Sequence, residues 1–159
     1  MKAVTTIALL FVLVSPAYGG NWPHWRGVHF NGSSEETNLP TTWSRTEGVV
    51  WSSDLPGPSA STPVVWGDHV FVSSLNLSGE QLKALCFDRR TGKPHWSHTV
   101  SPGLRRDERS SYAAPSPVTD GKIVVFFYGN GALVAYDFSG KEIWSRDIQK
   151  EYGVFAFGW

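Results

Sequence analysis

Cysteine and methionine are almost absent from this chain, and neither sign of charge is in excess. Its 159 residues contain one Cys, one Met, and 14 Lys plus Arg against 14 Asp plus Glu. A lone cysteine excludes an internal disulfide, and the apolar neighbours of Cys86 predict a buried thiol rather than a reactive one. Because neutralising phosphates requires a basic surface, the balanced charge gives no reason to expect a nucleic-acid partner.

A long apolar segment is also missing. The most pronounced apolar run, Ile7 to Val14, is shorter than the roughly 20 residues that a membrane-spanning helix needs. The small residues at both ends of Ala17-Tyr18-Gly19 suit cleavage by a signal peptidase. We therefore expect residues 1–19 to be a signal peptide that is cut after Gly19, and the mature chain to be periplasmic or secreted, with no membrane span. A retained membrane anchor is the alternative.

Aromatic and turn-forming residues are abundant instead. The chain has 8 Trp, 9 Phe and 5 Tyr together with 16 Gly and 10 Pro, which favours short strands joined by tight turns over long helices. Residues 20–47 show no regular pattern, but they contain Trp22, Trp25 and Trp43. Because a free tail would leave these indoles in water, we expect the segment to be an ordered N-terminal arm.

From about residue 48 onward the sequence repeats itself. Residues 61–72 and 115–126 each contain Pro-Val, a turn that ends in Gly, and a second apolar stretch, which predicts a β-hairpin. Residues 85–97 and 134–145 also match each other: each has an apolar strand, a turn from Asp to Gly-Lys, and a strand that ends in Trp-Ser. In that turn we expect the Asp side chain to bond backbone amides and the Gly to supply a positive φ.

The Trp-Ser pairs give the period of the repeat. They begin at Trp51, Trp96 and Trp144, which are 45 and 48 residues apart. A period near 45 residues with four strands per period is typical of β-propeller blades. Because an indole is a large apolar plate, we expect Trp96 and Trp144 to be mostly buried, each against the neighbouring unit.

The two units resemble the pyrroloquinoline-quinone-type (PQQ-like) β-propeller repeat. Asp88 to Trp96 follows that pattern closely, and Asp137 to Trp144 follows it with one residue deleted and Ser139 in place of Thr. The segment Trp22 to Gly27 is similar to the start of a group of exported bacterial members of this family. In such proteins an N-terminal strand closes the ring of blades.

The resemblance implies an all-β fold: an incomplete β-propeller of about two four-stranded antiparallel blades plus flanking strands. We place the blade-like units at about 53–100 and 111–148, within a repeat region, 48–159, that is incomplete at the C-terminus. The chain is thus expected to be an N-terminal fragment of an exported bacterial propeller protein. Open sheet edges on both sides predict association or aggregation.

Six residues are candidate contacts for a ligand or partner. Four precede the first strand of a unit, which is innermost in a propeller, and are expected near the central funnel; two belong to the charged link between the units. They are Ser59, Ser61, Ser111 and Tyr112, and Arg105 and Arg106. Ordinary turn residues and a solvated loop are the alternative interpretations. His95 and His98 are expected on opposite faces of one strand, so we predict no metal site there.

The sequence contains no recognisable set of nucleophile, base and oxyanion donors. We therefore expect an exported non-catalytic β-propeller protein that binds a protein or small ligand on a propeller face, or serves as a scaffold. The alternative implied by the resemblance is a partial quinoprotein (PQQ-dependent) dehydrogenase whose active site lies in missing blades. Such enzymes use calcium, an Asp base and often a Cys-Cys pair. This chain has no such pair, and we expect no cofactor, metal ligand or catalytic residue.

Overall fold

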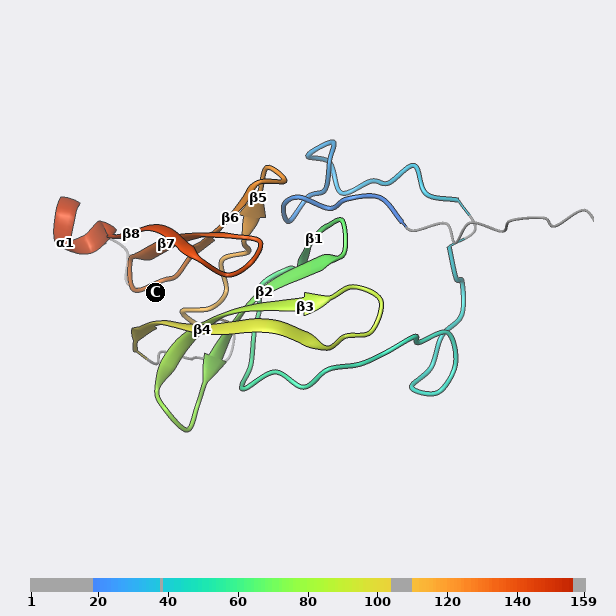
Figure 1. Cartoon of the computed structure of the whole chain (residues 1–159), viewed down its shortest axis with the longest axis horizontal. Coiled ribbons are helices and arrows are strands. Elements are labelled where there is room, and N and C mark those ends of the chain that lie inside the picture. Colours follow the sequence, from blue (N-terminus) through green and yellow to red (C-terminus); the bar gives the residue numbers. More distant parts are fainter. Residues whose placement is uncertain (1–18, 38, 104–109, 156–159) are drawn as a thin grey trace, which may run out of the picture.

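Two four-stranded antiparallel sheets make up most of the chain (Figure 1). The computed structural model describes residues 19–37, 39–103 and 110–155, so the predicted signal peptide lies outside the described residues apart from Gly19. The first sheet consists of β1 (Val64–Trp66), β2 (His69–Asn76), β3 (Gln81–Asp88) and β4 (Pro94–Pro102). The second consists of β5 (Val118–Thr119), β6 (Ile123–Phe127), β7 (Ala132–Asp137) and β8 (Glu142–Asp147). In both sheets the strands follow one another in sequence order.

These sheets confirm the predicted all-β fold with two four-stranded antiparallel units. Each sheet starts with a short inner strand and ends with the strand that carries Trp-Ser. Across the described ranges, no helix has the length and apolar character needed to cross a membrane.

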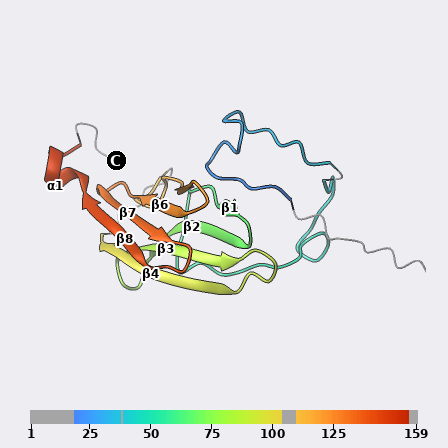
Figure 2. The same cartoon turned by 45° about the horizontal axis from the view of Figure 1, so that its top comes forward.

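The main hydrophobic core lies between the two sheets, which pack against each other in Figure 2. Phe71 and Cys86, paired across β2 and β3, are fully buried there. Val124 and Phe126 of β6 contribute from the second sheet. As predicted, Cys86 is a buried free thiol, and burial raises its pKa to about 12. It is therefore a packing residue rather than a nucleophile.

The turns between the third and fourth strands of each sheet have the predicted chemistry. Asp88 Oδ1 accepts hydrogen bonds from the Thr91 amide and hydroxyl, both at 2.7 Å, and Asp137 Oδ1 accepts from the Lys141 amide at 3.0 Å. The glycines that follow, Gly92 and Gly140, have φ of 69° and 89°. Both turns therefore need glycine, because other residues adopt this conformation at a cost.

The repeat indoles join each sheet to the element before it. Trp51 Nε1 donates a hydrogen bond to the carbonyl oxygen of Arg89 at 2.8 Å, and Trp96 Nε1 donates to the carbonyl oxygen of Phe138 at 3.1 Å. Arg89 and Phe138 are equivalent, since each directly follows the aspartate of its turn. The same contact is thus made twice, one repeat apart.

The expected burial of the two Trp side chains is only partly correct. Trp96 is half-buried between the sheets, with its ring 5.4 Å from that of Tyr136 and 6.2 Å from that of Phe126. Trp144 is 37% exposed, and the described residues contain no neighbouring unit against which it packs, contrary to that part of the prediction. The physical reason is its position: all six residues of β8 are exposed, because no described segment covers that strand.

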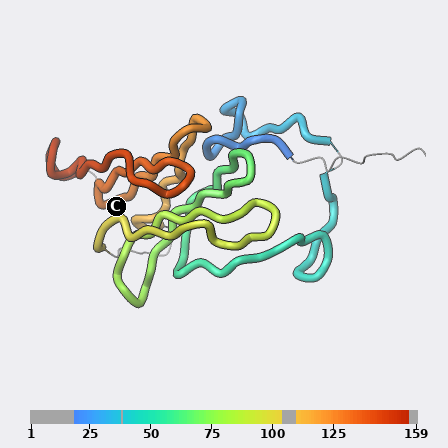
Figure 3. Tube along the Cα trace, viewed as in Figure 1, coloured from blue at the N-terminus to red at the C-terminus, as the bar shows by residue number. Residues whose placement is uncertain are grey.

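The N-terminal arm reaches the inner strands of both sheets. Trp22 and Val65 of β1 exchange two backbone hydrogen bonds, of 2.8 and 2.9 Å, and the carbonyl of Pro23 accepts a hydrogen bond from the amide of Thr119 in β5 at 2.9 Å. Figure 3 shows the blue start of the arm beside β1 and β5. Two of the three indoles of the arm, Trp25 and Trp43, are 63% and 70% exposed, so the contacts of Trp22 and Pro23 rather than burial of these two rings hold the arm against the sheets.

One short helix, α1 (Ile148–Tyr152), was not predicted. The Asp147 side chain accepts a hydrogen bond from the Lys150 amide at 3.0 Å and caps its start. Gly153, with φ of 98°, ends it. The helix has five residues and buries none of them, so it leaves no apolar period in the sequence.

Candidate functional site

The antiparallel topology gives the sheets two different ends. The loops that enter β1 and β5 lie at one end, together with the β2–β3 and β6–β7 connections; we call this the loop end. The β1–β2 and β3–β4 turns, around Gly67 and Gly92, lie at the opposite end, together with their equivalents in the second sheet; we call this the turn end.

Ser59 and Ser61 lie together at the loop end and are bound to the first sheet. Their hydroxyl oxygens are 3.0 Å apart. The Ser61 hydroxyl also accepts a hydrogen bond from the Ser73 amide at 3.3 Å and donates to the Ser73 carbonyl at 3.5 Å. The Ser61 side chain therefore fixes the loop onto β2, and the Ser59 hydroxyl supports Ser61.

Ser111 and Tyr112 occupy the equivalent loop before β5. The buried Ser111 hydroxyl accepts a hydrogen bond from the Ala113 amide at 3.2 Å. The carbonyl of Tyr112 accepts one from the Gly129 amide at 2.9 Å, and its half-buried ring packs against the main core. These contacts hold the loop against the second sheet, and the role of Ser111 and Tyr112 in ligand contact stays a prediction. The other two candidates, Arg105 and Arg106, lie outside the described residues.

The two loops are joined by a pair of residues that the sequence analysis did not single out. The Ser116 hydroxyl accepts a hydrogen bond from the Thr62 amide at 2.8 Å, and the Ser73 hydroxyl donates to the Pro115 carbonyl at 3.3 Å. The repeat in the sequence could have indicated Ser116, because Thr62 and Ser116 occupy the same position before the aligned prolines. Ser73 has no such signal.

A buried phenol lies in the core beneath this end. Tyr128 has no exposed surface, and the Ser73 side chain lies beside its hydroxyl. Burial raises the pKa of Tyr128 above its ordinary value. The phenol therefore stays protonated at neutral pH, which excludes a role as a general base.

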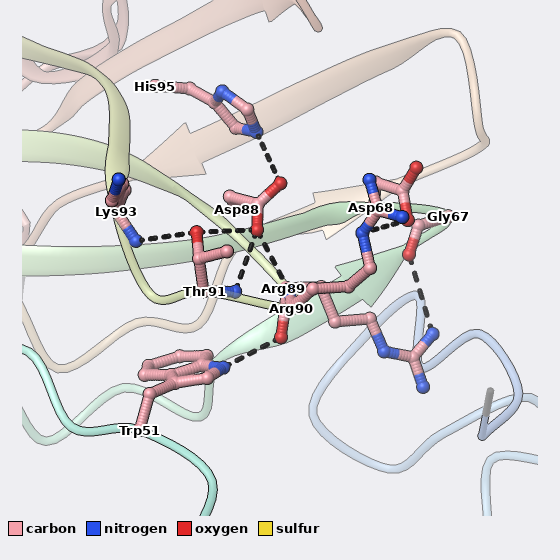
Figure 4. Close-up of polar contacts among 9 residues, drawn as sticks. All are labelled: Trp51, Gly67, Asp68, Asp88, Arg89, Arg90, Thr91, Lys93 and His95. Carbon is pink, nitrogen blue, oxygen red and sulfur yellow. Dashed lines mark hydrogen bonds and ion pairs between the residues drawn. The ribbon is translucent and has the colours of Figure 1, made fainter. Parts of the chain in front are cut away.

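The turn end contains the densest group of charged side chains (Figure 4). The Asp88 carboxylate faces His95, with Oδ2 and Nε2 3.7 Å apart. The Thr91 hydroxyl, followed by backbone amides, holds the pKa of Asp88 below its usual range. Arg90 Nε lies 3.9 Å from Asp68 Oδ1. Asp88 is thus an ionised acceptor inside a turn, which suits neither a general acid nor a base poised near neutral pH.

Neither end of the described residues brings together groups for covalent or acid–base chemistry. No group of three His, Cys, Asp or Glu side chains in these residues could hold a metal ion. What the described chain does present is apolar surface, including Ile143 and Trp144 on β8, which are 50% and 37% exposed. We call the exposed strand Glu142–Asp147 the β8 surface. It is the candidate functional site because all six of its residues are exposed and two of them are large and apolar.

Comparison with known proteins identifies the family to which the chain belongs. No curated protein matches the chain. The crystal structure of BamB from Moraxella catarrhalis matches with 21% sequence identity and a TM-score of 0.44, over 61% of this chain and 26% of that chain. This chain thus spans about a quarter of the length of that relative. Residues 33–154 match the model of the family described as outer membrane protein assembly factor BamB, and the chain belongs to this family of PQQ-like β-propeller repeat proteins.

Proposed function

We propose that the chain is an exported, non-catalytic scaffold protein that binds another protein through the β8 surface. The observation that carries the proposal is the match of residues 33–154 to the family described as outer membrane protein assembly factor BamB, and the β8 surface is the part of the described chain that we propose for the contact. Trp51 and Trp96 each donate a hydrogen bond to a turn carbonyl, whereas Trp144 lies on a strand with six exposed residues. Within the described residues β8 is the outer strand of its sheet, and exposed apolar side chains there are suited to contact with another polypeptide.

The family name suggests the class of partner. A protein that takes part in outer membrane protein assembly would work in the periplasm, which agrees with export of this chain after cleavage of residues 1–19. Its partner would be a protein of the same assembly process. The proposal includes no quinone cofactor, since the loop-end hydroxyls of Ser59, Ser61 and Ser111 already bond within the chain.

Site-specific photocrosslinking in cells tests this proposal. A photoreactive residue is placed at Ile143 on the β8 surface or, as the control, at exposed Lys93 in the turn end. We expect Ile143 to capture a protein of outer membrane assembly that Lys93 does not, and the substitution Trp144→Ser to reduce the yield. Mass spectrometry identifies the product.

Two results would contradict the proposal. Equal capture from Ile143 and Lys93 would mean that β8 is not the binding surface, and crosslinks only between two copies of the chain would mean self-association. The quinone alternative is checked on the same protein. A new absorbance band with PQQ and calcium, accompanied by dye reduction on alcohols or sugars, would show an enzyme instead of a scaffold.

A further inference from the structure

The arm becomes anchored at the residues that directly follow the predicted cleavage point. The side-chain oxygen of Asn21 accepts a hydrogen bond from the amide of Gly67 at 2.9 Å, and Trp22 pairs with Val65 through two backbone hydrogen bonds. Gly20, one residue earlier, is exposed. A cut before Gly20 would therefore place the new amino terminus at a defined position beside the first sheet.

An acidic side chain lies at that position. The carboxylate of Glu36 accepts a hydrogen bond from the backbone N–H of Gly20. Short-range contacts shape the loop around it, since the Glu36 amide donates to the Ser34 hydroxyl at 3.1 Å and the Ser33 amide donates to Asn31 Oδ1 at 2.9 Å. The carboxylate thus contacts the nitrogen that cleavage would convert from an amide into an amine.

We propose that Glu36 binds the α-ammonium group of Gly20 in the mature protein. The inference rests on the export proposed above and extends it. Hydrolysis adds one water across the Gly19–Gly20 amide bond, so Gly19 leaves with a carboxylate and Gly20 gains an amine. With an ordinary pKa of about 7.7–8.0, that amine is largely protonated at neutral pH. It then offers three N–H donors and a positive charge where the amide offered one neutral donor, so the carboxylate gains an opposite charge as its partner, and bonds of the type N⁺–H···O⁻ are among the strong ones.

Three other ionisable groups line the same open hollow: His29, Glu35 and Arg89. Arg89 donates a hydrogen bond to the carbonyl of Gly19 in the uncut chain, and its positive charge disfavours a second cation nearby. Glu35 lies 3.8 Å from His29 and is 91% exposed. A valid comparison therefore keeps Arg89 and removes only the charge of Glu36, and Glu35, its neighbour in sequence, serves as the matched control.

The experiment uses the full chain, expressed with residues 1–19 and purified after export. Intact mass shows whether the mature chain starts at Gly20. The pKa of the α-amine is then measured from the pH dependence of its reductive methylation in the wild type, Glu36→Gln and Glu35→Gln. We expect Glu36→Gln to lower this pKa by roughly 0.2–0.7 unit, the range that exposed ion pairs give, and to raise the amine's reactivity at pH 7 by up to about fivefold. Glu35→Gln should leave the pKa at its wild-type value.

The possible failures are distinguishable. Purified protein that still contains residues 1–19 would contradict both the proposed export and the binding of the α-ammonium group by Glu36. A chain that starts at Gly20 but has the same α-amine pKa in the wild type and Glu36→Gln would overturn the inference alone. A variant with one extra Ala before Gly20 moves the ammonium away from Glu36, so Glu36→Gln should have no effect in it. An undiminished effect there would indicate a general charge effect and would also overturn the inference.

Discussion

Trp51, Trp96 and Trp144 occupy the same place in the repeat but contribute differently to the folded protein. Trp51 and Trp96 each donate an indole hydrogen bond to a turn one repeat further along the chain. Within the described residues no equivalent turn reaches Trp144, which is 37% exposed. The energetic contribution of an indole in this repeat therefore depends on the neighbouring turn and not on the Trp-Ser motif itself.

Replacing each indole by Ala tests this at the scale of the single residue. Trp96→Ala removes contacts with Phe71, Phe126 and Tyr136 from between the sheets, and we expect it to lower the free energy of unfolding by about 3 kcal/mol. Trp144→Ala should change it by no more than about 0.5 kcal/mol, as for a surface substitution. Urea denaturation followed by circular dichroism measures both. Similar losses in the two variants would contradict the difference in environment.

At the scale of the element, the turn glycines are matched to the indoles that cover them. A Cβ added at Gly92 would lie 2.4 Å from the ring of Trp51, and one added at Gly140 would lie 2.8 Å from the ring of Trp96. Both glycines have positive φ. Each turn thus requires glycine for two separate reasons, its backbone conformation and the close approach of an indole.

A pair of glycine variants separates these two reasons. Gly67 also has positive φ, but a Cβ there would have no atom within 4 Å, so Gly67→Ala should cost only the backbone term of about 1–2 kcal/mol. Gly92→Ala must in addition displace Trp51, and we expect it to cost about 1–3 kcal/mol more. Thermal unfolding of the two variants against the wild type gives the comparison. Equal destabilisation would mean that the indole moves without cost.

The elements that the sequence predicts well are those whose causes are local. The turn of Asp88 and Gly92 is determined by one side chain and one backbone conformation within five residues. In contrast, the pairing of Trp22 with Val65 and the contact of Glu36 with Gly20 join distant segments, and no composition or spacing marks them. Ser59, Ser61 and Ser111 lie in the loops that lead into β1 and β5, a placement that the repeat indicates. The sequence could not show that their hydroxyls bond within the chain, because this depends on the partner loop and on β2.

At the scale of the whole molecule, the contact between the sheets contains ionisable rings. The ring centre of His69 lies 5.0 Å from that of Phe138 in the second sheet and 5.1 Å from that of His95. Burial, followed by the neighbouring His95, lowers the pKa of His69, while Asp68 and Asp88 oppose the shift. The sheet contact therefore favours neutral His69.

This shift predicts a pH dependence of stability with a definite sign. The folded protein binds the proton of His69 more weakly than the unfolded chain does. The contribution of His69 to the free energy of unfolding is therefore fully present above a pH of about 6.5, and it is lost as the pH falls below that value. We expect His69→Phe, which keeps a ring between the sheets, to reduce the loss of stability between pH 7 and pH 5. Urea midpoints across this range provide the measurement. An unaltered pH profile in His69→Phe would contradict the assignment.

The path of the arm also constrains the order in which the protein can fold. Trp22 and Pro23 stand near the start of the chain, yet their hydrogen-bond partners are Val65 in β1 and Thr119 in β5. A growing polypeptide presents these two residues long before β5 has been synthesised. Contacts between such distant segments slow folding, because the chain loses the entropy of closing the loop before the stabilising hydrogen bonds form. Trp22 and Pro23 are therefore expected to be among the last residues to reach their native positions, and their docking completes the assembly of the two sheets.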